Sequence, residues 1–344
     1  MTADTVTART GARFARAGSL LRARELGIVL AIVIVFVAAT IANPAFAHLD
    51  SVQQLLIGAS LIALMGVGET LVILTRNYDL SVGSVLGLCA YVIGMTFRAH
   101  PGMPAILGFL IGIALGAAIG AINGWITTFF HVPSLAVTLA MLYVIRGVDG
   151  VIVNGHTIDP DVIPASFQAV SYRTILGIPW LALIVVIVVA LFAYLLRSFR
   201  WARDLYAIGS SPDAANLAGI PSGRRVFIAF VISGALAGLA GGLFLALHAQ
   251  IDVTGGNGYE LSVIAAVVVG GVAIFGGSGT VVGAALGAVL LNTIDQALVA
   301  TKVSSFWNQA IAGALLLIAI AFDRWLGLRV AKSLRSAKGA HRDL

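Results

Sequence analysis

The stretch MPAILGFLIGIALGAAIGAINGWIT, residues 103–127, contains no charged side chain. It is long enough to cross a bilayer as a helix, because a span needs about 20 mostly apolar residues. Two apolar stretches carry glycines at four-residue spacing, namely Gly108, Gly112, Gly116 and Gly120 here and Gly234, Gly238 and Gly242 further on. Helices in lipid associate by close packing of small residues, so we predict that both glycine faces are helix contacts.

The composition extends this reading to the whole chain. Of its 344 residues, 59% are apolar and only 10% are charged, and the mean hydropathy is +1.01. Soluble domains carry about 25% charged residues, so an ordinary soluble protein is excluded. The formal charge of +6 does not indicate nucleic-acid binding, because the basic residues lie between apolar segments rather than in one patch. We predict an all-α integral membrane protein.

Apolar segments recur along the chain at span length. About ten transmembrane helices are predicted, at residues 26–42, 52–75, 82–98, 103–127, 134–153, 180–197, 225–247, 260–275, 279–299 and 305–323. The segment 260–275 is short for a full crossing and lies between two glycine clusters, so a re-entrant segment is the alternative. The segment 26–42 follows a basic stretch like a signal peptide, but it exceeds the roughly 7–15 apolar residues of such a signal, so we predict that it is retained.

The basic residues predict the orientation. With ten spans and a cytoplasmic N-terminus, only Arg98, Arg146, Arg173 and Lys302 of the 21 Lys and Arg residues lie outside cytoplasmic segments. Cytoplasmic loops are enriched in Lys and Arg, so we predict that both termini are cytoplasmic. The chain then divides into a basic tail at 1–25, a membrane domain at 26–325 and a basic tail at 326–344. Within the membrane domain, 198–224 is a cytoplasmic loop, and 154–179 is an extracytoplasmic loop that is either a docking surface or a passive connector.

The cytoplasmic loop contains a short helix with its own start and stop signals. Ser211 is suited to the N-cap, Pro212 to the first helical position and Asp213 to the positive end of the helix dipole, while Gly219 is placed to end the helix. Three apolar residues share one face of this helix, namely Ala214, Leu217 and Ala218. Such a stripe either docks into a partner or packs on the membrane surface or on the protein's own bundle.

Several ordered motifs resemble one family. The segment Ser211, Pro212, Asp213, Ala214, Ala215, Asn216, Leu217, Ala218, Gly219 and Ile220 resembles the cytoplasmic coupling loop of ABC importer permeases for ribose, xylose, rhamnose and furanosyl autoinducers. Asp79-Leu80-Ser81-Val82-Gly83-Ser84, Arg146-Gly147 and Gly276-Gly277-Ser278-Gly279 resemble further motifs of that family. Thr75-Arg76-Asn77-Tyr78 departs from the Gly-Gly pair of many ribose-type permeases. With Trp307-Asn308, this departure makes the chain most similar to the rhamnose and autoinducer permeases.

The resemblance implies a permease subunit of an importer in the bacterial plasma (inner) membrane. Its partners would be a second permease chain, identical or paralogous, an ATP-binding subunit and an extracytoplasmic substrate-binding protein. The chain itself lacks the G-x-x-x-x-G-K phosphate-binding loop, so ATP and Mg²⁺ would be bound by the partner subunits. It also lacks the H-E-x-x-H and G-x-S-x-G patterns, and its one cysteine, Cys89, has no partner. No metal site, cofactor or catalytic residue is therefore predicted in this chain.

Polar residues inside apolar segments are functional candidates, because burying them in a membrane is costly. We predict pathway or gating roles for Asn77, Asp79, Ser81, Ser84 and Glu260. The structural alternative is that Asp79 caps the helix that follows it and pairs with Arg76.

Two other kinds of function remain as alternatives. The first is a self-contained, ion-coupled secondary transporter with Glu69, Asp79 or Asp295 as the coupling carboxylate. The second is a membrane-embedded enzyme, for which the sequence shows no constellation of catalytic residues.

Overall fold

The computed structural model of the protein describes residues 25–304, 307, 310–321 and 324. Within these residues, eight helices are long and apolar enough to cross a membrane. They are Glu25–Ala42, α2 (Leu49–Leu74), α3 (Val82–Ala99), α4 (Ala105–Phe129), α5 (Ser134–Val153), α7 (Trp180–Ser198), α10 (Ser222–His248) and α12 (Val281–Ala300). The predicted all-α fold is confirmed. Of the predicted tails at 1–25 and 326–344, only Glu25 lies within the described residues, where it begins the first helix.

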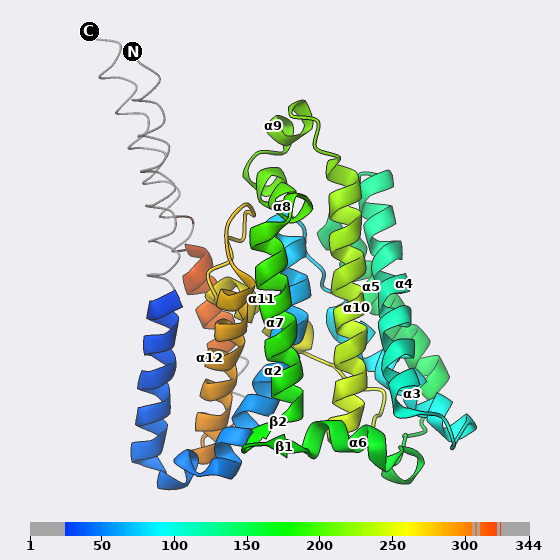
Figure 1. Ribbon diagram of the computed structural model, residues 1–344, viewed down its shortest axis with the longest axis vertical. Helices are drawn as coiled ribbons and strands as arrows, with labels where there is room; N and C mark the ends of the chain where they lie inside the picture. Colours follow the sequence, from blue (N-terminus) through cyan, green and yellow to red (C-terminus); the bar gives the residue numbers. More distant parts are fainter. Residues whose placement is uncertain (1–24, 305–306, 308–309, 322–323, 325–344) are drawn as a thin grey trace.

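The helices form a bundle around α2 and α10 (Figure 1). α10 packs against α4, α3 and α2, while α2 also contacts α12, α11 and α7. Both central helices are buried along most of their length, because they carry apolar residues on all sides. The helix Glu25–Ala42 is instead largely exposed at the edge of the bundle.

The eighth predicted span is wrong as a continuous helix. Residues 249–258 form a loop, and only α11 (Tyr259–Val269) is helical before the glycine-rich loop 270–280. At about 1.5 Å per residue, the 11 residues of α11 cover only about half of the roughly 30 Å hydrocarbon core. The chain nevertheless passes from the end of α10 to the opposite end of the bundle, where α12 starts (Figure 1). Loop and half-helix together make this crossing. The tenth predicted span is described at residues 310–321, which are helical.

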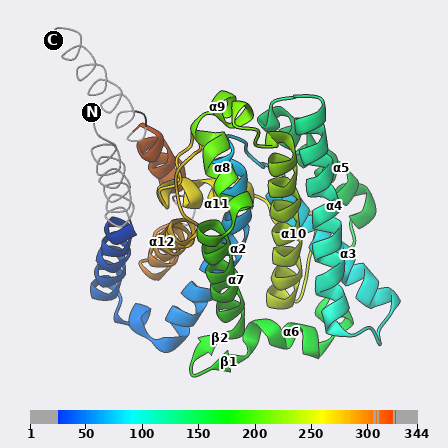
Figure 2. The ribbon, with the colours of Figure 1, turned by 45° about the horizontal axis from the view of Figure 1, so that its top comes forward.

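The two ends of the bundle carry different structures (Figures 1 and 2). At one end, α8 (Arg200–Ser210) and α9 (Pro212–Leu217) stand above α7 and α10. At the other end lie α6 (Ala165–Tyr172) and a hairpin of β1 (Thr174–Ile175) and β2 (Ile178–Pro179), with the short 3-10 helix η2 (Pro160–Val162) before them. A second 3-10 helix, η1 (Pro44–Ala47), joins the first helix to α2.

The sequence analysis missed α8, α6 and the hairpin. α8 contains several charged residues and therefore escapes a search for apolar segments, although its inward face is buried. The hairpin is decided by two backbone positions with positive φ, Leu176 at 52° and Gly177 at 81°, a geometry typical of tight turns between antiparallel strands. In α6, Phe167 is fully buried and stacks on Phe109, with ring centroids 4.4 Å apart. The loop 154–179 is thus a folded cap rather than an extended connector.

The predicted glycine contacts are confirmed. α4 and α10 approach so closely that a β-carbon on Gly116 would collide with the carbonyl oxygen of Gly234. Likewise, a β-carbon on Gly238 would collide with the carbonyl oxygen of Gly112. At one end of this contact, β-carbons on Gly108 and Gly242 would meet phenylalanine rings instead of backbone. Close backbone approach of this kind allows the van der Waals packing that helps to hold helices together in lipid.

Candidate functional site

The predicted short helix forms as expected and projects from the bundle. The side chain of Ser211 accepts a hydrogen bond from the Ala214 amide at 3.4 Å, and Pro212 occupies the first helical position. Gly219 has φ of +74°, which ends the helix in a conformation that glycine adopts without strain. Leu217 is 91% exposed, and Ala214 and Ala218 are exposed beside it. The stripe therefore does not pack on the protein's own bundle.

α8 holds this helix against two loops at the same end of the bundle. The Arg76 guanidinium donates from Nε to the Gly209 carbonyl at 2.5 Å and from Nη2 to the Ser210 carbonyl at 3.0 Å, both at the C-terminal end of α8. Arg76 therefore does not pair with Asp79, and that prediction is wrong. Arg76 has φ of +65°, and its guanidinium reaches α8. Positive charge at a helix C-terminus is also favoured by the helix dipole.

The second loop that contacts α8 is the glycine-rich loop 270–280. The Tyr206 hydroxyl donates to the Gly279 carbonyl at 3.0 Å, and burial raises the pKa of Tyr206 to about 12. The Gly277 amide donates to the Leu74 carbonyl at the end of α2 at 3.1 Å. A rigid displacement of α8 would therefore reach the ends of both α2 and α12.

An ion pair joins the two helices that flank α9. Arg225, near the start of α10, donates from Nε to Asp204 of α8 at 2.8 Å, and its Nη2 lies 2.8 Å from the same carboxylate oxygen. Both side chains are mostly buried, which protects the pair from screening by solvent. The pair fixes the distance between α8 and α10, so that the α9 segment is held at both ends.

We expect Arg76→Gln to weaken the coupling between α8 and the membrane helices. The variant loses charge-assisted hydrogen bonds that are worth about 1.5–3 kcal/mol each. The melting temperature of the protein in mild detergent should fall by several degrees. Arg203→Gln serves as a matched control, because Arg203 is exposed on α8 and its side chain makes no hydrogen bond within the described residues. Equal melting temperatures for the two variants would show that the contact of Arg76 with α8 does not stabilise this end of the bundle.

Three of the predicted pathway residues come together in a buried network at the start of α3. Asp79 Oδ1 accepts from the Ser81 amide at 3.1 Å and from the Ser81 hydroxyl at 2.6 Å. Its Oδ2 accepts from the Ser233 hydroxyl of α10 at 3.2 Å. The Ser84 hydroxyl donates to the Ser81 carbonyl at 2.8 Å, and Asn123 of α4 donates to the Ser81 hydroxyl at 2.9 Å. The network joins α3, α4 and α10.

Glu69 of α2 completes this network by accepting from the Asp79 amide at 3.1 Å. Glu69, Asp79, Ser81 and Ser84 are all at most 1% exposed, and none of them lines a cavity described below. The network is therefore buried within the bundle at the start of α3. Sequence reasoning singled out Glu69 but did not predict Ser233 as a partner, because nothing local marks a serine on a distant helix.

The other two predicted residues lie apart from the network. Asn77 is half-buried and donates to the carbonyl and the hydroxyl of Thr75, both at 3.0 Å. Glu260 lies at the start of α11, where its Oε1 accepts from the Gly258 amide at 3.3 Å. Its carboxylate lies against Gly83, on the first turn of α3. The N-terminal ends of the two helices thus meet inside the bundle.

A charged cluster supports the loop 249–258 from the side of α5. Arg146 donates to the Gly255 carbonyl at 2.6 Å and interacts electrostatically with Glu260 and Asp149. The Arg146 guanidinium also approaches Gly87, one helical turn beyond Gly83 on α3. A glycine at each of these positions leaves room for the loop and for the charged side chains. The Arg-Gly motif at 146 therefore has a structural role in holding the loop at membrane depth.

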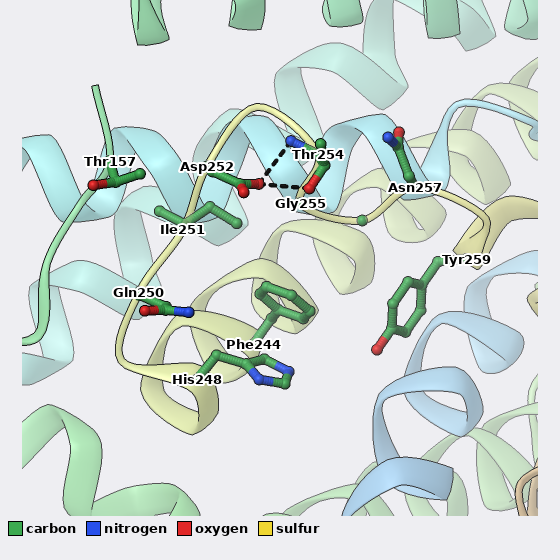
Figure 3. Close-up of a pocket in the computed structure, with 11 residues that line it drawn as sticks. Thr157, Phe244, His248, Gln250, Ile251, Asp252, Thr254, Gly255, Asn257 and Tyr259 are labelled. Atoms are coloured by element: carbon green, nitrogen blue, oxygen red, sulfur yellow. Dashed lines mark hydrogen bonds between the residues drawn. The ribbon is translucent and has the colours of Figure 1, made fainter. Parts of the chain in front are cut away.

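Two cavities adjoin this loop. The first cavity, of about 380 Å³, is lined by Phe244, His248, Asp252, Asn257 and Tyr259 among others (Figure 3). The rings of Phe244 and His248 lie 4.3 Å apart between centroids, and the Tyr259 ring meets Phe244 edge-on at 6.0 Å. The hydroxyl and the amide of Thr254 donate hydrogen bonds to the Asp252 carboxylate at 2.6 and 2.8 Å.

The second cavity, of about 610 Å³, lies on the other side of a shared wall (His248, Asn257 and Tyr259). Asp295 and Gln296 of α12 line it from the far side. Sequence reasoning named Asp295 but missed the shared wall, whose members are spread over a helix end and a loop. The signal that could have found it is the glycine cluster at 255–258, since non-helical backbone at membrane depth is tolerated only where it lines a cavity or is buried in protein.

Comparison with known proteins identifies similar chains. Residues 51–320 match the family model described as "Branched-chain amino acid transport system / permease component". The chain is 33% identical over 323 residues to the autoinducer 2 import system permease protein LsrC of Escherichia coli, with 92% of each chain covered. It is 34% identical over 319 residues to the LsrC protein of Yersinia pestis, covering 92% of this chain and 89% of the relative. No solved structure gives a significant match.

Proposed function

Because the chain belongs to the branched-chain amino acid transport system permease family, we propose that it is the membrane-spanning subunit of an ATP-driven importer for a monosaccharide or small furanosyl compound. Membership confirms the resemblance drawn from the motifs. It also confirms a multi-pass permease of the inner membrane and a transporter subunit rather than an enzyme. The named cargo of the relatives, autoinducer 2, and the rhamnose type of sugar are the first candidates for this chain.

The observation that carries the proposal is the capped helix α9 with its unpartnered apolar stripe. Leu217 is 91% exposed, and with the exposed Ala214 and Ala218 it forms an apolar face that a partner can cover. We assign α9 as the segment that docks into an ATP-binding subunit. That subunit would bind ATP and Mg²⁺. Its closure would move α8, and the contacts of α8 with the Arg76 turn and with the loop 270–280 would pass the motion to α2, α3 and α12.

In this proposal the Asp79 network acts as a gate, because it ties the start of α3 to α2, α4 and α10 and must rearrange if those helices separate. Asn77 and Glu260 both lie near the start of α3. Asp79 and Glu69 are poor candidates for ion coupling, since neither lines a cavity in the described residues. The remaining partners are a second permease chain and an extracytoplasmic substrate-binding protein, which would dock on the folded cap of residues 154–179.

The orientation follows from α9. An ATP-binding partner places α9 in the cytoplasm, together with Arg197, Arg200 and Arg203 on the neighbouring segment. Glu25 accepts a hydrogen bond from Thr280 at 2.8 Å at the same end of the bundle, which supports a cytoplasmic N-terminus. Ten crossings then return the C-terminus to the cytoplasm.

We expect Leu217→Asp to uncouple transport from ATP hydrolysis. Burial of a leucine at an interface contributes about 1.5–3 kcal/mol, so losing it weakens docking by about tenfold or more. Uptake of autoinducer 2 and L-rhamnose is measured in cells at equal expression, and co-purifying chains are identified by mass spectrometry. Leu217→Met keeps the apolar contact and should transport normally.

Unchanged uptake by Leu217→Asp would remove the docking role of α9. A chain that purifies alone and transports without ATP would instead support the ion-coupled alternative.

A further inference from the structure

We propose that the two adjoining cavities at the α10–α11 connection form a binding site for the cargo within a single chain. The proposal rests on the proposed function and adds the place in the chain at which a neutral ring molecule rich in hydroxyl groups binds. Volumes of about 380 and 610 Å³ fall within the range of small-molecule sites. α10 ends on the side of the bundle opposite α9 (Figure 1), and the loop that lines the site leads from there to α11 inside the bundle. An extracytoplasmic protein would deliver its cargo from that side.

The polar groups of this site are free to bind a ligand. The side chains of His248, Asn257, Tyr259, Asp295 and Gln296 make no hydrogen bond within the described part of the chain. This differs from the Asp79 network, whose hydroxyls and carboxylates are bound to one another. Polar groups that face a cavity without protein partners are the groups that can exchange water for ligand hydroxyls.

The arrangement suits a ring with one apolar face and polar edges. The rings of Phe244, His248 and Tyr259 form an aromatic surface in the first cavity, as Figure 3 shows. A sugar-like ring can lay its C–H face on this surface while its hydroxyls reach Asn257 on the shared wall. Tyr259 interacts electrostatically with Asp295, so donor and carboxylate acceptor face the second cavity together. Weak, multiple contacts of this kind permit release, which transport requires.

Charge argues against an amino acid as the ligand. No Lys or Arg lines either cavity among the described residues, whereas the carboxylates of Asp252 and Asp295 do. The carboxylate of a branched-chain amino acid would find no cation among these lining residues. A neutral polyol carries no charge that needs pairing.

The test uses protection of an introduced thiol in the assembled transporter. Cys89 is the only cysteine and is buried, so Asn257→Cys provides a single accessible thiol. We expect a water-soluble maleimide to label it from outside and autoinducer 2 or L-rhamnose to slow the labelling, while leucine has no effect. Adding Asp295→Asn should raise the protecting concentration about threefold to tenfold, the effect of one hydrogen bond. Asp50→Cys, exposed at the start of α2, is the control that should label without protection.

Each outcome decides a separate point. An unlabelled Asn257→Cys chain in which Asp50→Cys labels overturns the site. Labelling without protection by either sugar also overturns it, provided that the wild-type transporter imports one of them, and the proposed function then stands. Protection by leucine overturns the assignment of a neutral polyol. A wild-type transporter that imports neither compound defeats the proposed function, and the cargo site falls with it.

Discussion

Replacing Gly116 by leucine is expected to prevent assembly of the membrane bundle. A β-carbon at this position already collides with the carbonyl oxygen of Gly234, so the branched side chain has no space beyond it. The obstacle is backbone rather than a flexible side chain, and α4 and α10 must move apart to admit it. Overpacking costs about 1–3 kcal/mol where side chains can adjust, and we expect more here.

The measurement is the yield of monodisperse chain in mild detergent together with its thermal melting temperature. Ala118→Leu is the matched control, because Ala118 is exposed on the same helix and should tolerate the larger side chain. Comparable yield and melting temperature for both variants would show that α4 and α10 do not meet through their glycine faces.

Asp79→Ala is expected to have the second largest effect. The substitution leaves the amide and hydroxyl of Ser81 and the hydroxyl of Ser233 without their acceptor in a buried site. Each buried donor without a partner costs about 1–3 kcal/mol, so the loss should reach about 3 kcal/mol or more. Because the network also ties α3 to α10, transport should fall along with stability.

Thermal melting in detergent and ATP-driven uptake test this expectation. Asp79→Asn keeps an acceptor oxygen and should lie between wild type and Asp79→Ala in both measurements. Asp50→Ala, on the exposed first turn of α2, controls for the loss of a carboxylate. If Asp79→Ala has the same melting temperature as the wild-type protein, the hydroxyls find other acceptors and the network does not hold the start of α3.

The spans were predictable wherever length and hydropathy alone decide the structure. α4 and α12 lie within a few residues of their expected ranges, and the spacing of Gly116 and its neighbours identified the contact face. The prediction for 260–275 was wrong because hydropathy reports which segments prefer lipid, not whether their backbone is helical. The glycines at both ends were the only local sign of loops.

The short helix α9 was predictable to within one residue because caps act locally. Ser211 and Gly219 are sufficient to define its start and stop. The partner of Arg76 was not predictable in the same way. Its positive φ and the position of α8, 133 residues later in the chain, decide where the guanidinium binds. Long-range hydrogen bonds of this kind leave no periodic pattern in a sequence.

The half-helix α11 also constrains how the protein enters the membrane during synthesis. Its 11 residues are too few to be recognised and inserted as an independent span. The amides and carbonyls of the loop before it cannot face lipid unsatisfied, so this segment has no stable place in the bilayer until α10, α3 and α12 surround it. α12 must therefore be inserted before the eighth crossing, formed by the loop 249–258 and α11, reaches its final structure. The region that forms both cavities is thus the last part of the bundle to be completed in the membrane.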